Sequence, residues 1–422
     1  MSNYLVAGAG VTGCVTALEL ALQGQNVTIL EATGRAGGKI LSYCCKATDS
    51  CSRCGVCVAH SRIAEALAHP LVETLTGARI ESVEHRGGRV AIGGAALNPR
   101  ISHRKCIDCE ACAIACPAGC ITRYSRGGFT AYGVELSACL LRKGASCAAC
   151  LEACPTAAIT VDGPESPFSL EVDGALIATG HETFDPRVRP RLGYGRIAGV
   201  MTGLEAEQML ARQAFLSADG GAGGGAPAKH AEPAARVAFI QCVGSRDPHL
   251  GRNFCSSVCC AYALRMSRIL KHRRPETDVT IYFIDIQNFD KVFTPFRSEL
   301  ERMGVRFVRG IPFSVTRASA GGLSLLIEDP DGGRTTASHD VVVLSVGMSP
   351  ADGAGRMAEL FGLARDEFGF YSSTLPNVLV AGTCAEPQGI VDSVASARAA
   401  AWELLKATAA AEAQQLRIGS PA

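Results

Sequence analysis

Short apolar runs alternate in this chain with glycine-rich turns and with segments whose apolar residues recur at helical spacing. The first series begins with an apolar strand at residues 4–7, continues with a helix at 14–23 and returns to a second strand at 27–30. Strands that are apolar on both faces and alternate with helices are typical of parallel sheets. The N-terminal segment is therefore predicted to be a Rossmann-like α/β domain.

A second series of the same kind begins far along the chain. Residues 236–240 predict a buried strand, residues 261–270 a helix, and residues 278–285 and 340–347 two further strands. The fold class predicted is α/β: one Rossmann-like domain that is interrupted by an insertion, and a second dinucleotide-binding-like domain.

The turn after the first strand carries a dinucleotide-binding pattern. It reads Gly8-Ala-Gly10-Val11-Thr12-Gly13, and the second strand is followed by Glu31. In such a unit the backbone approaches a pyrophosphate at Gly10, the helix N-terminus favours the phosphates, and the acid about twenty residues on binds a ribose hydroxyl. A lone GxGxxG is weak evidence, but its place between strand, helix, strand and Glu31 makes it specific. The alternative is a glycine-rich turn without a ligand.

Composition narrows the class of protein. The chain has 422 residues, is 47% apolar and carries a formal net charge of +1, which gives no reason to expect a nucleic-acid partner. No apolar run reaches the roughly 18 residues of a membrane span, and the sequence enters its first strand without a signal peptide. We expect a cytoplasmic protein without a direct membrane span.

The 20 cysteines are clustered, and two clusters have ferredoxin spacing. One run is CxxCxxCxxxCP, and the other has the same ending with a longer first gap. In this arrangement the last cysteine of each run crosses to the other cluster. One predicted [4Fe–4S] group is Cys106, Cys109, Cys112 and Cys154, and the other is Cys116, Cys139, Cys147 and Cys150. The alternatives are structural zinc or free thiols; Cys120 is expected to be a core or loop thiol.

Two further groups have unusual spacing. Five thiols lie between residues 44 and 57; a cluster held by Cys45, Cys51, Cys54 and Cys57 is favoured, with Cys44 as the rival for the first position. A zinc knot or a redox-active dithiol remains open there. The strand at 236–240 is followed by Cys242, Cys255, Cys259 and Cys260 instead of a glycine loop. This disfavours NAD(P)H binding in the second domain, while spacing alone leaves a cluster open.

Three segments resemble the flavoproteins with two dinucleotide-binding domains, the family of thioredoxin reductase. They are residues 31–38 (EATGRAGG), 175–180 (ALIATG) and 377–383 (NVLVAGT). The resemblance implies FAD, although this chain has Thr383 where the family usually has Asp. The residues implied or predicted to bind it are Gly8, Gly10, Val11, Thr12, Gly13, Glu31, Ala32, Arg35, Gly38, Ala178, Thr179, Gly180, Gly382 and Thr383. For His181 a surface or core role is favoured over a flavin contact.

Six segments carry a second resemblance, which extends over nearly the whole chain. They are residues 49–54, 239–246, 255–263, 282–286, 341–347 and 392–394. These segments resemble HdrA, the flavin and iron–sulfur subunit of heterodisulfide reductase. The resemblance implies that Cys242, Cys255, Cys259 and Cys260 hold a [4Fe–4S] cluster, for up to four clusters in all. It implies redox partners of the HdrB and HdrC kind, or of the hydrogenase, dehydrogenase or benzoyl-CoA reductase type. A homodimer is left open.

The predicted function is that of an oxidoreductase subunit that passes electrons through FAD and clusters, with flavin-based bifurcation as a hypothesis. The alternatives are a stand-alone NAD(P)H-dependent flavin oxidoreductase and a zinc-stabilised scaffold. The predicted domains are 1–97, 166–200 and 346–422 for FAD, the first with the Cys44–Cys57 loop, 98–165 for the ferredoxin and 201–345 for the second Rossmann-like domain. A Gly/Ala-rich linker is predicted at 217–230.

Overall fold

The computed structural model describes the chain except for residues 127–128, 162, 212–234, 288–292, 329–330 and 419–422. The predicted linker at 217–230 lies outside the described residues. The chain forms two compact units. Unit 1 comprises residues 1–41, 55–181 and 350–422, and unit 2 comprises residues 42–54 and 182–349.

Unit 1 is built on a five-stranded parallel sheet of order β24-β11-β1-β2-β3. These strands bring together three distant parts of the sequence, because β11 pairs with β1 on one side and with β24 on the other. Their bounds are β1 (Asn3–Ala7), β2 (Asn26–Glu31), β3 (Val72–Thr76), β11 (Gly174–Ile177) and β24 (Val378–Val380). The predicted first strand–helix–strand unit is confirmed.

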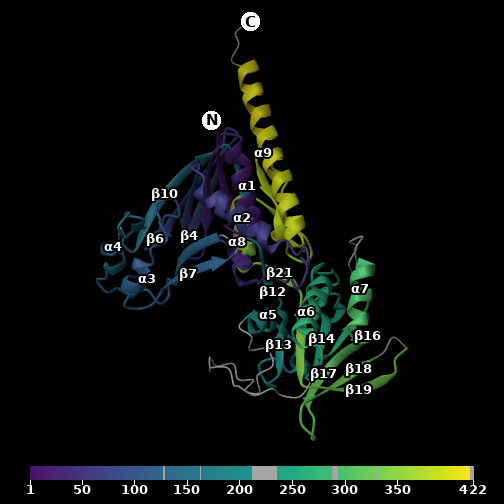
Figure 1. Cartoon of the computed structure of the whole chain (residues 1–422). Helices are drawn as coiled ribbons and strands as arrows, with labels where there is room; N and C mark the ends of the chain where they lie inside the picture. Colours follow the sequence, from purple (N-terminus) through teal and green to yellow (C-terminus); the bar gives the residue numbers. More distant parts are fainter. Residues whose placement is uncertain (127–128, 162, 212–234, 288–292, 329–330, 419–422) are drawn as a thin grey trace. The chain divides into compact units, whose positions relative to one another are not determined.

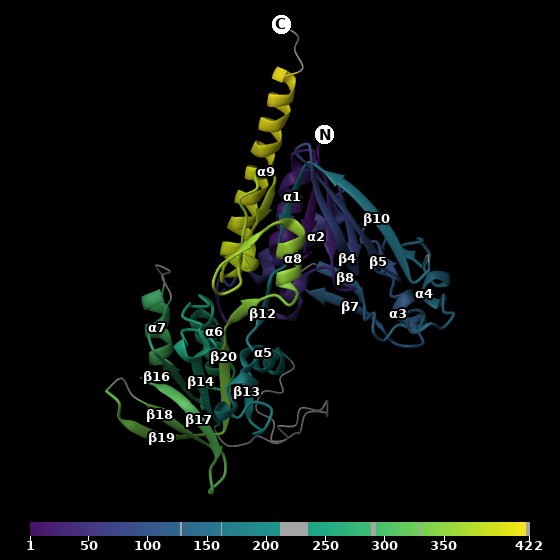
Figure 2. The ribbon, with the colours of Figure 1, turned by 180° about the vertical axis from the view of Figure 1, so that it is seen from behind.

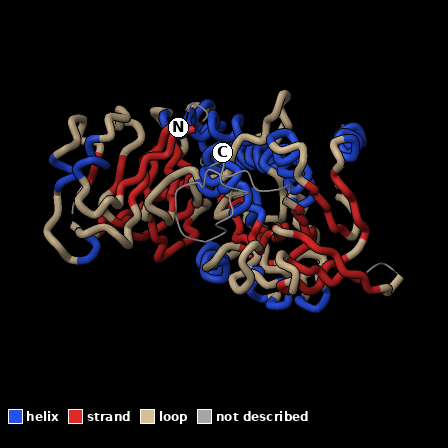
Figure 3. Tube along the Cα trace, turned by 60° about the horizontal axis from the view of Figure 1, so that its bottom comes forward, coloured by secondary structure: helices blue, strands red, loops and turns tan. Residues whose placement is uncertain are grey.

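Helices lie along this sheet, as Figure 3 shows with helices in blue and strands in red. They are α1 (Val11–Leu22), α2 (Val56–Ala68), α8 (Ala354–Phe361) and α9 (Ile390–Ile418). Figures 1 and 2 show α9 alongside α1 from both sides. Hydrogen bonds to α1 and β1 hold α9 in place: the Thr16 hydroxyl donates to the Ala397 carbonyl (3.0 Å), and the Tyr4 hydroxyl donates to Thr408 Oγ1 (2.9 Å).

An antiparallel sheet of order β10-β5-β4 follows β3, with β4 (Ala78–Arg86), β5 (Arg89–Leu97) and β10 (Glu165–Val172). β4 and β5 form an antiparallel hairpin. At Asp173 the chain turns from β10 into β11, which belongs to the parallel sheet. Residues 98–164 leave this sheet between β5 and β10, whose ends pair at Leu97 and Glu165.

The inserted segment is small and rich in turns. Its elements are β6 (Arg100–Ile101), α3 (Ala111–Ala115), β7 (Ile121–Arg126), β8 (Phe129–Val134), α4 (Ala149–Glu152) and β9 (Ile159–Thr160). β6 pairs with β9, and β7 pairs with β8. Its core is built largely around cysteines, including the buried Cys112, Cys120 and Cys139.

Unit 2 is built on a parallel sheet of order β13-β20-β14-β15-β16 and an antiparallel sheet of order β17-β18-β19. The first strands are β13 (Val200–Thr202), β14 (Arg236–Val243), β15 (Asp278–Phe283), β16 (Val305–Arg309) and β20 (Val341–Val346). The others are β17 (Ile311–Arg317), β18 (Leu323–Glu328) and β19 (Arg334–His339). The helices are α5 (Gly203–Ala211), α6 (Cys259–Arg273) and α7 (Phe293–Arg302). The second predicted Rossmann-like series is confirmed.

Two short sheets complete the described fold: β12 (His181–Thr183) with β21 (Met348–Pro350), and β22 (Ala364–Arg365) with β23 (Tyr371–Ser372). The units differ from the predicted domains in one respect that matters for function. Residues 42–54, which we expected to belong to the first Rossmann-like domain, are part of unit 2. Within the described residues, no helix is both long and apolar enough to cross a membrane.

Candidate functional site

The glycine loop between β1 and α1 is packed tightly on one side and open on the other. Gly8 has φ +112°, and a side chain there would collide with the Ala178 carbonyl at the end of β11. At Gly10, in contrast, an added Cβ would meet no heavy atom within 4 Å. The loop thus leaves space directly in front of the α1 N-terminus, where free N–H groups favour an anion.

Glu31 closes this loop from the end of β2. It is buried, and its Oε2 accepts a hydrogen bond from the Ala9 N–H (2.9 Å). Its Oε1 accepts from the N–H and hydroxyl of Thr33 (2.9 and 2.8 Å). The carboxylate is therefore held against the glycine loop, as ribose recognition requires.

The turn after Glu31 also contacts the glycine loop. The Gly37 N–H donates to the Ala9 carbonyl (2.8 Å), and an added Cβ at Gly38 would lie 3.0 Å from Gly10 Cα. Ala32 and Arg35 belong to the same turn and are respectively exposed and half-buried.

The end of β24 completes the candidate FAD residues. Gly382 has φ +76°, and a side chain there would collide with the Thr12 hydroxyl at the start of α1. Thr383 Oγ1 lies 2.9 Å from His181 Nδ1, directly after the turn Ala178–Gly180. Burial, aided by the Lys39 charge, lowers the pKa of His181 to about 4. For His181 the sequence favours a surface or core role. In the structure it is a neutral side chain beside Thr383.

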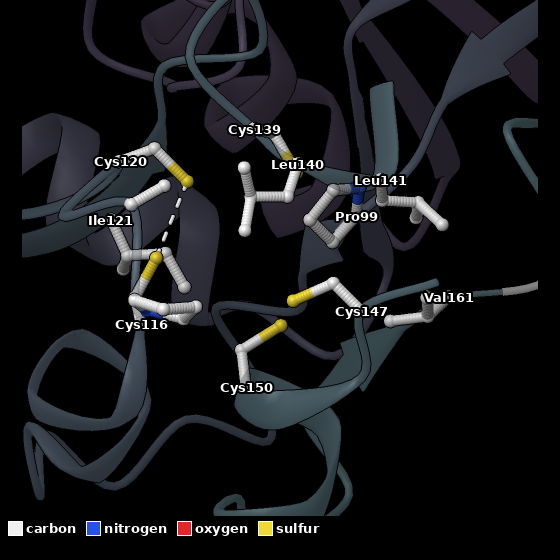
Figure 4. Close-up of a pocket in the computed structure, with 12 residues that line it drawn as sticks. Pro99, Cys116, Cys120, Ile121, Cys139, Leu140, Leu141, Cys147, Cys150 and Val161 are labelled. Atoms are coloured by element: carbon white, nitrogen blue, oxygen red, sulfur yellow. Dashed lines mark hydrogen bonds between the residues drawn. The ribbon is translucent and has the colours of Figure 1, made fainter. Parts of the chain in front are cut away.

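The inserted segment contains two hollows, each lined by cysteines. Figure 4 shows the first, of about 360 Å³, part of it open to solvent. The thiols of Cys147 and Cys150 point into it from below, and those of Cys116, Cys120 and Cys139 lie around the opposite side. Five thiols, rather than four, therefore line this hollow.

The second hollow, of about 300 Å³, is lined by Cys106, Cys109, Cys112 and Cys154, with Ile107 and Tyr132 beside them. The last cysteine of each run thus lies with the first three of the other run. Asp108 orients this wall, because its carboxylate accepts hydrogen bonds from the Tyr132 hydroxyl (2.6 Å) and from Arg123 (2.8 and 2.6 Å). Hydrogen bonds from Arg123 and Tyr132 lower the pKa of Asp108 to about 2.

The crossing cysteines differ from the other thiols. Although burial acts in the opposite direction, hydrogen bonds from the backbone N–H groups of Ala158, Thr156 and Ile159 lower the pKa of the Cys154 thiol. At Cys116 burial again acts to raise the pKa of the thiol. Hydrogen bonds from backbone N–H groups and from the Cys120 side chain outweigh it, and the pKa is lowered. Burial and the interaction with Cys116 raise the pKa of Cys120 to about 12. Thiolate ligands are thus favoured at the two crossing positions.

The insertion is connected to the glycine-loop region by β8. The Val134 N–H donates to the Gly34 carbonyl (3.1 Å), and the next N–H, of Glu135, donates to the Cys120 carbonyl (2.8 Å). His60 of α2 adds a second contact, since its ring lies against Phe129 and its Nε2 is 3.0 Å from the Tyr124 hydroxyl. The five-thiol hollow is therefore tied by backbone hydrogen bonds to the turn that follows Glu31.

The third group lies where β14 ends and α6 begins in unit 2. Cys242 has φ +59° and Ser257 φ +60°, left-handed conformations that let the chain present thiols from both ends of the loop. Burial, followed by the charge of Cys260, raises the pKa of Cys242 to about 12. Burial, followed by the charges of the other three thiols, also raises the pKa of Cys259. Cys242, Cys255, Cys259 and Cys260 are thus close enough to interact.

The fourth group is divided between the units. Cys44, Cys45, Cys51 and Cys54 lie in unit 2, whereas Cys57 lies in the first turn of α2 in unit 1. The loop is held by α6: Arg268 donates to the Ser50 hydroxyl (2.7 Å), and Arg265 donates to the Ser52 carbonyl (3.2 Å). Backbone N–H groups also lie 3.5 and 3.4 Å from the sulfurs of Cys45 and Cys51.

Sequence did not predict the buried ion pair beside this loop. Glu207 of α5 pairs with Lys46 and accepts hydrogen bonds from the Cys44 N–H and the Tyr262 hydroxyl. The only sequence signal was an isolated Lys between cysteines. Throughout the described residues, no three His, Cys, Asp or Glu side chains lie close enough to share a single metal ion.

Comparisons with known proteins agree with this organisation. Residues 105–158 match the family model "4Fe-4S dicluster domain", and residues 6–60 match "NAD(P)-binding Rossmann-like domain". Over 97% of its length the chain is 32% identical to a CoB–CoM heterodisulfide reductase iron–sulfur subunit, an HdrA protein, of Methanopyrus kandleri, of which it covers 64%. The predicted resemblance to HdrA is confirmed.

A second relative is the HdrA protein of the H2:CoB-CoM heterodisulfide,ferredoxin reductase of Methanothermobacter thermautotrophicus. It is 30% identical over 94% of this chain and is covered over 62% of its own length. The chain therefore spans somewhat less than two thirds of these relatives. Among solved structures, thioredoxin reductases of Lactococcus lactis (13% identity, TM-score 0.53, covering 97% and 99% of the two chains) and T. acidophilum (14%, 0.51, 96% and 99%) share the fold.

Proposed function

We propose that this chain is an FAD- and iron–sulfur-containing electron-transfer subunit of a larger redox complex of the heterodisulfide reductase type. The observation that carries the proposal is the division of the thiols in residues 105–158 between two hollows, each with four predicted ligands from both runs. A second observation supports it: the insertion is hydrogen bonded to the turn after Glu31, and that turn contacts the glycine loop expected to bind a dinucleotide.

The residues around the cradle fit FAD. Gly10 leaves open space in front of the α1 N-terminus, and Glu31 is held at the end of β2, where a ribose would lie. Gly382 reaches the same helix start from β24, and Thr383 follows it beside His181. Bound FAD would supply the exchange of electron pairs and single electrons. The chain would bind and orient the flavin. His181, which is neutral, would place an imidazole without positive charge beside Thr383.

The thiols of the two hollows fit [4Fe–4S] clusters. Each hollow contains the four predicted ligand thiols, drawn from both runs, which is the ligand number and order of a two-cluster ferredoxin. The chain would set their potentials through burial and through N–H groups directed at sulfur, such as that of Ala158 toward Cys154 (3.3 Å).

We extend the proposal to one cluster at Cys242, Cys255, Cys259 and Cys260. These thiols interact with one another at the α6 N-terminus, where the helix dipole favours negative charge. The preceding Gln241 is buried, and neither of its amide atoms has a hydrogen-bond partner among the described residues. An amide of this kind can donate to a cluster sulfur.

We also propose a cluster in the 44–57 group, with three of its ligands at Cys45, Cys51 and Cys54. The sequence favours Cys57 as the fourth ligand, with Cys44 as the alternative to Cys45. Support comes from the N–H groups close to Cys45 and Cys51 and from the fastening of the loop to α6.

The partners proposed are redox subunits, and the chemistry proposed for the whole complex includes splitting of an electron pair between two acceptors. The curated relatives are named as single subunits of reductases, and two acceptors, heterodisulfide and ferredoxin, are part of one relative's name. Bifurcation is tested in the reconstituted complex by the ratio of the two reduced products. A fixed one-to-one ratio that persists when either acceptor is in excess supports it, and independent rates contradict it.

Two alternatives make different predictions. A stand-alone NAD(P)H-dependent flavin oxidoreductase would have its flavin bleached by NADH or NADPH without partners. The end of β14 carries Cys242 and leads into a loop without a glycine cradle, which disfavours this alternative. A zinc-stabilised scaffold would be colourless and would contain zinc instead of iron.

The deciding experiment measures iron, acid-labile sulfide, zinc and flavin per chain on protein purified without oxygen. We expect one FAD and about sixteen iron, four for each of four clusters. About eight iron would leave only the two hollows as cluster sites. Protein with zinc and no sulfide would overturn the proposal.

A further inference from the structure

The first hollow contains one thiol more than a cluster needs. Cys120 is buried, and its sulfur lies 3.4 Å from that of Cys116 (Figure 4). Its neighbours in the hollow already include the four predicted ligands, Cys116, Cys139, Cys147 and Cys150. The sequence alone gave no reason to treat Cys120 as more than a core or loop thiol.

The second half of the insertion provides an internal comparison. Residues 116–122 read CPAGCIT, and residues 154–160 read CPTAAIT, so Cys116 corresponds to Cys154 and Cys120 to Ala158. Both crossing cysteines precede a turn and a strand that begins with Ile, β7 or β9. Ala158 is as deeply buried as Cys120, and its N–H donates to Cys154. The same turn is therefore formed with and without the additional thiol.

We propose that Cys120 is a positioning residue whose S–H donates a hydrogen bond to the ligand sulfur of Cys116 and makes the cluster in the first hollow easier to reduce than it would otherwise be. This inference rests on the proposed iron–sulfur function. It distinguishes the two hollows, since the side chain of the corresponding Ala158 has no hydrogen-bond donor.

The direction of the hydrogen bond follows from the roles of the two thiols. Cys116 as a ligand is a thiolate without a proton, so Cys120 must be the donor. Reduction adds negative charge that is shared with the ligand sulfurs, and a donor stabilises that charge more in the reduced state than in the oxidised state. Hydrogen bonds to the sulfurs are one of the factors that set cluster potentials.

Cys120 also connects the first hollow to a neighbouring part of unit 1. Its carbonyl accepts the N–H of Glu135, the residue that follows the Val134–Gly34 backbone contact. The cluster whose reduction Cys120 favours would therefore be the one whose wall is hydrogen bonded to the turn after Glu31.

The test is a redox titration of the full chain, followed by electron paramagnetic resonance, with iron counted in each sample. Cys120→Ala copies the residue at the corresponding position and is expected to keep all iron. It should lower one midpoint potential, with up to about a tenfold decrease in the equilibrium constant for one-electron reduction, or about 59 mV. Cys120→Ser keeps a donor and should retain the wild-type potential or raise it.

The reciprocal variant, Ala158→Cys, should raise the other midpoint and leave the first unchanged. Full iron with unchanged potentials in Cys120→Ala would overturn the inference. Loss of about four iron in Cys120→Ala would also overturn it, because Cys120 would then itself be a ligand. Wild-type protein without iron in this segment would instead refute the proposed function, and this inference with it.

Discussion

The ammonium of Lys46 and the carboxylate of Glu207 form a buried ion pair in unit 2, although 161 residues separate them in the chain. The ammonium also donates to the Cys44 carbonyl (3.1 Å) and lies 5.2 Å from the ring centre of Tyr262. One carboxylate thereby holds the start of the cysteine loop on α5 and α6. This explains why residues 42–54 are part of unit 2.

Glu207→Ala should therefore be strongly destabilising. It leaves the Lys46 charge buried without a partner, which costs about 3–5 kcal/mol in other proteins. The free energy of unfolding, from denaturant titration of the protein, is the measurement. The control is Glu403→Ala, which removes an exposed pair with Lys406 and should cost less than about 1 kcal/mol.

The double variant Lys46→Met/Glu207→Leu removes both charges. Because no unpaired charge remains buried, it should recover part of the stability lost in Glu207→Ala. A double variant less stable than Glu207→Ala would contradict this account of the pair.

Gly10→Ala should remove flavin without unfolding the protein. An added methyl group meets no protein atom within 4 Å, so it enters only the space assigned to the pyrophosphate. We expect flavin per chain to fall at least tenfold while the melting temperature of the flavin-free protein stays that of flavin-free wild type. Full flavin content in this variant would argue that the dinucleotide lies elsewhere.

Gly382→Ala should disturb the same site through protein contacts. The methyl group would collide with Thr12, in addition to the strain of φ +76°. Gly251→Ala is the matched control, because Gly251 has φ +64° but open space around it. We expect flavin loss and a larger fall in melting temperature for the first variant only; equal effects would show that backbone strain alone is responsible.

Iron counts can test the crossed arrangement of the thiols. Cys106 and Cys154 line the same hollow, so Cys106→Ala/Cys154→Ala should lose no more than the about four iron lost in Cys106→Ala. Cys106→Ala/Cys116→Ala disrupts both hollows and should lose about eight. A reversed pattern would mean that each run holds its own cluster.

Acid should destabilise unit 2 through His339. Burial, followed by the charge of Arg306, lowers the pKa of His339 to about 4, and its Nε2 lies 2.9 Å from the Tyr282 hydroxyl. The unfolded chain takes up this proton near pH 6.5, whereas the folded chain does not until about pH 4. Stability linked to His339 is thus full above pH 6.5 and is lost as the pH falls toward 4.

The linkage predicts a loss of about 2 kcal/mol between pH 7 and pH 5 from this residue. His339→Gln cannot be protonated, so its free energy of unfolding should change less over that interval than the wild-type value does. The comparison uses denaturant titrations at both pH values. An identical pH dependence in the two proteins would exclude His339 as a contributor.

Local patterns in the sequence determined the parts of this protein that depend on near neighbours. The strand–glycine loop–helix unit at residues 3–22 and the strand and helix around Cys242 were predictable, because apolar periodicity and turn residues act over a few positions. The cysteine runs were predictable as well, because the spacing of the cysteines along the chain identifies the cluster ligands.

Only the tertiary structure decided which distant groups meet. The sequence contains no sign that Glu207 pairs with Lys46 or that His181 contacts Thr383, because these contacts join residues from separate parts of the fold. The sequence also does not distinguish Cys120 from a core thiol, because only its contact with the Cys116 sulfur sets it apart. The sequence by itself determined which chemical groups this chain carries, and the packing of its sheets and helices decided which of them act on one another.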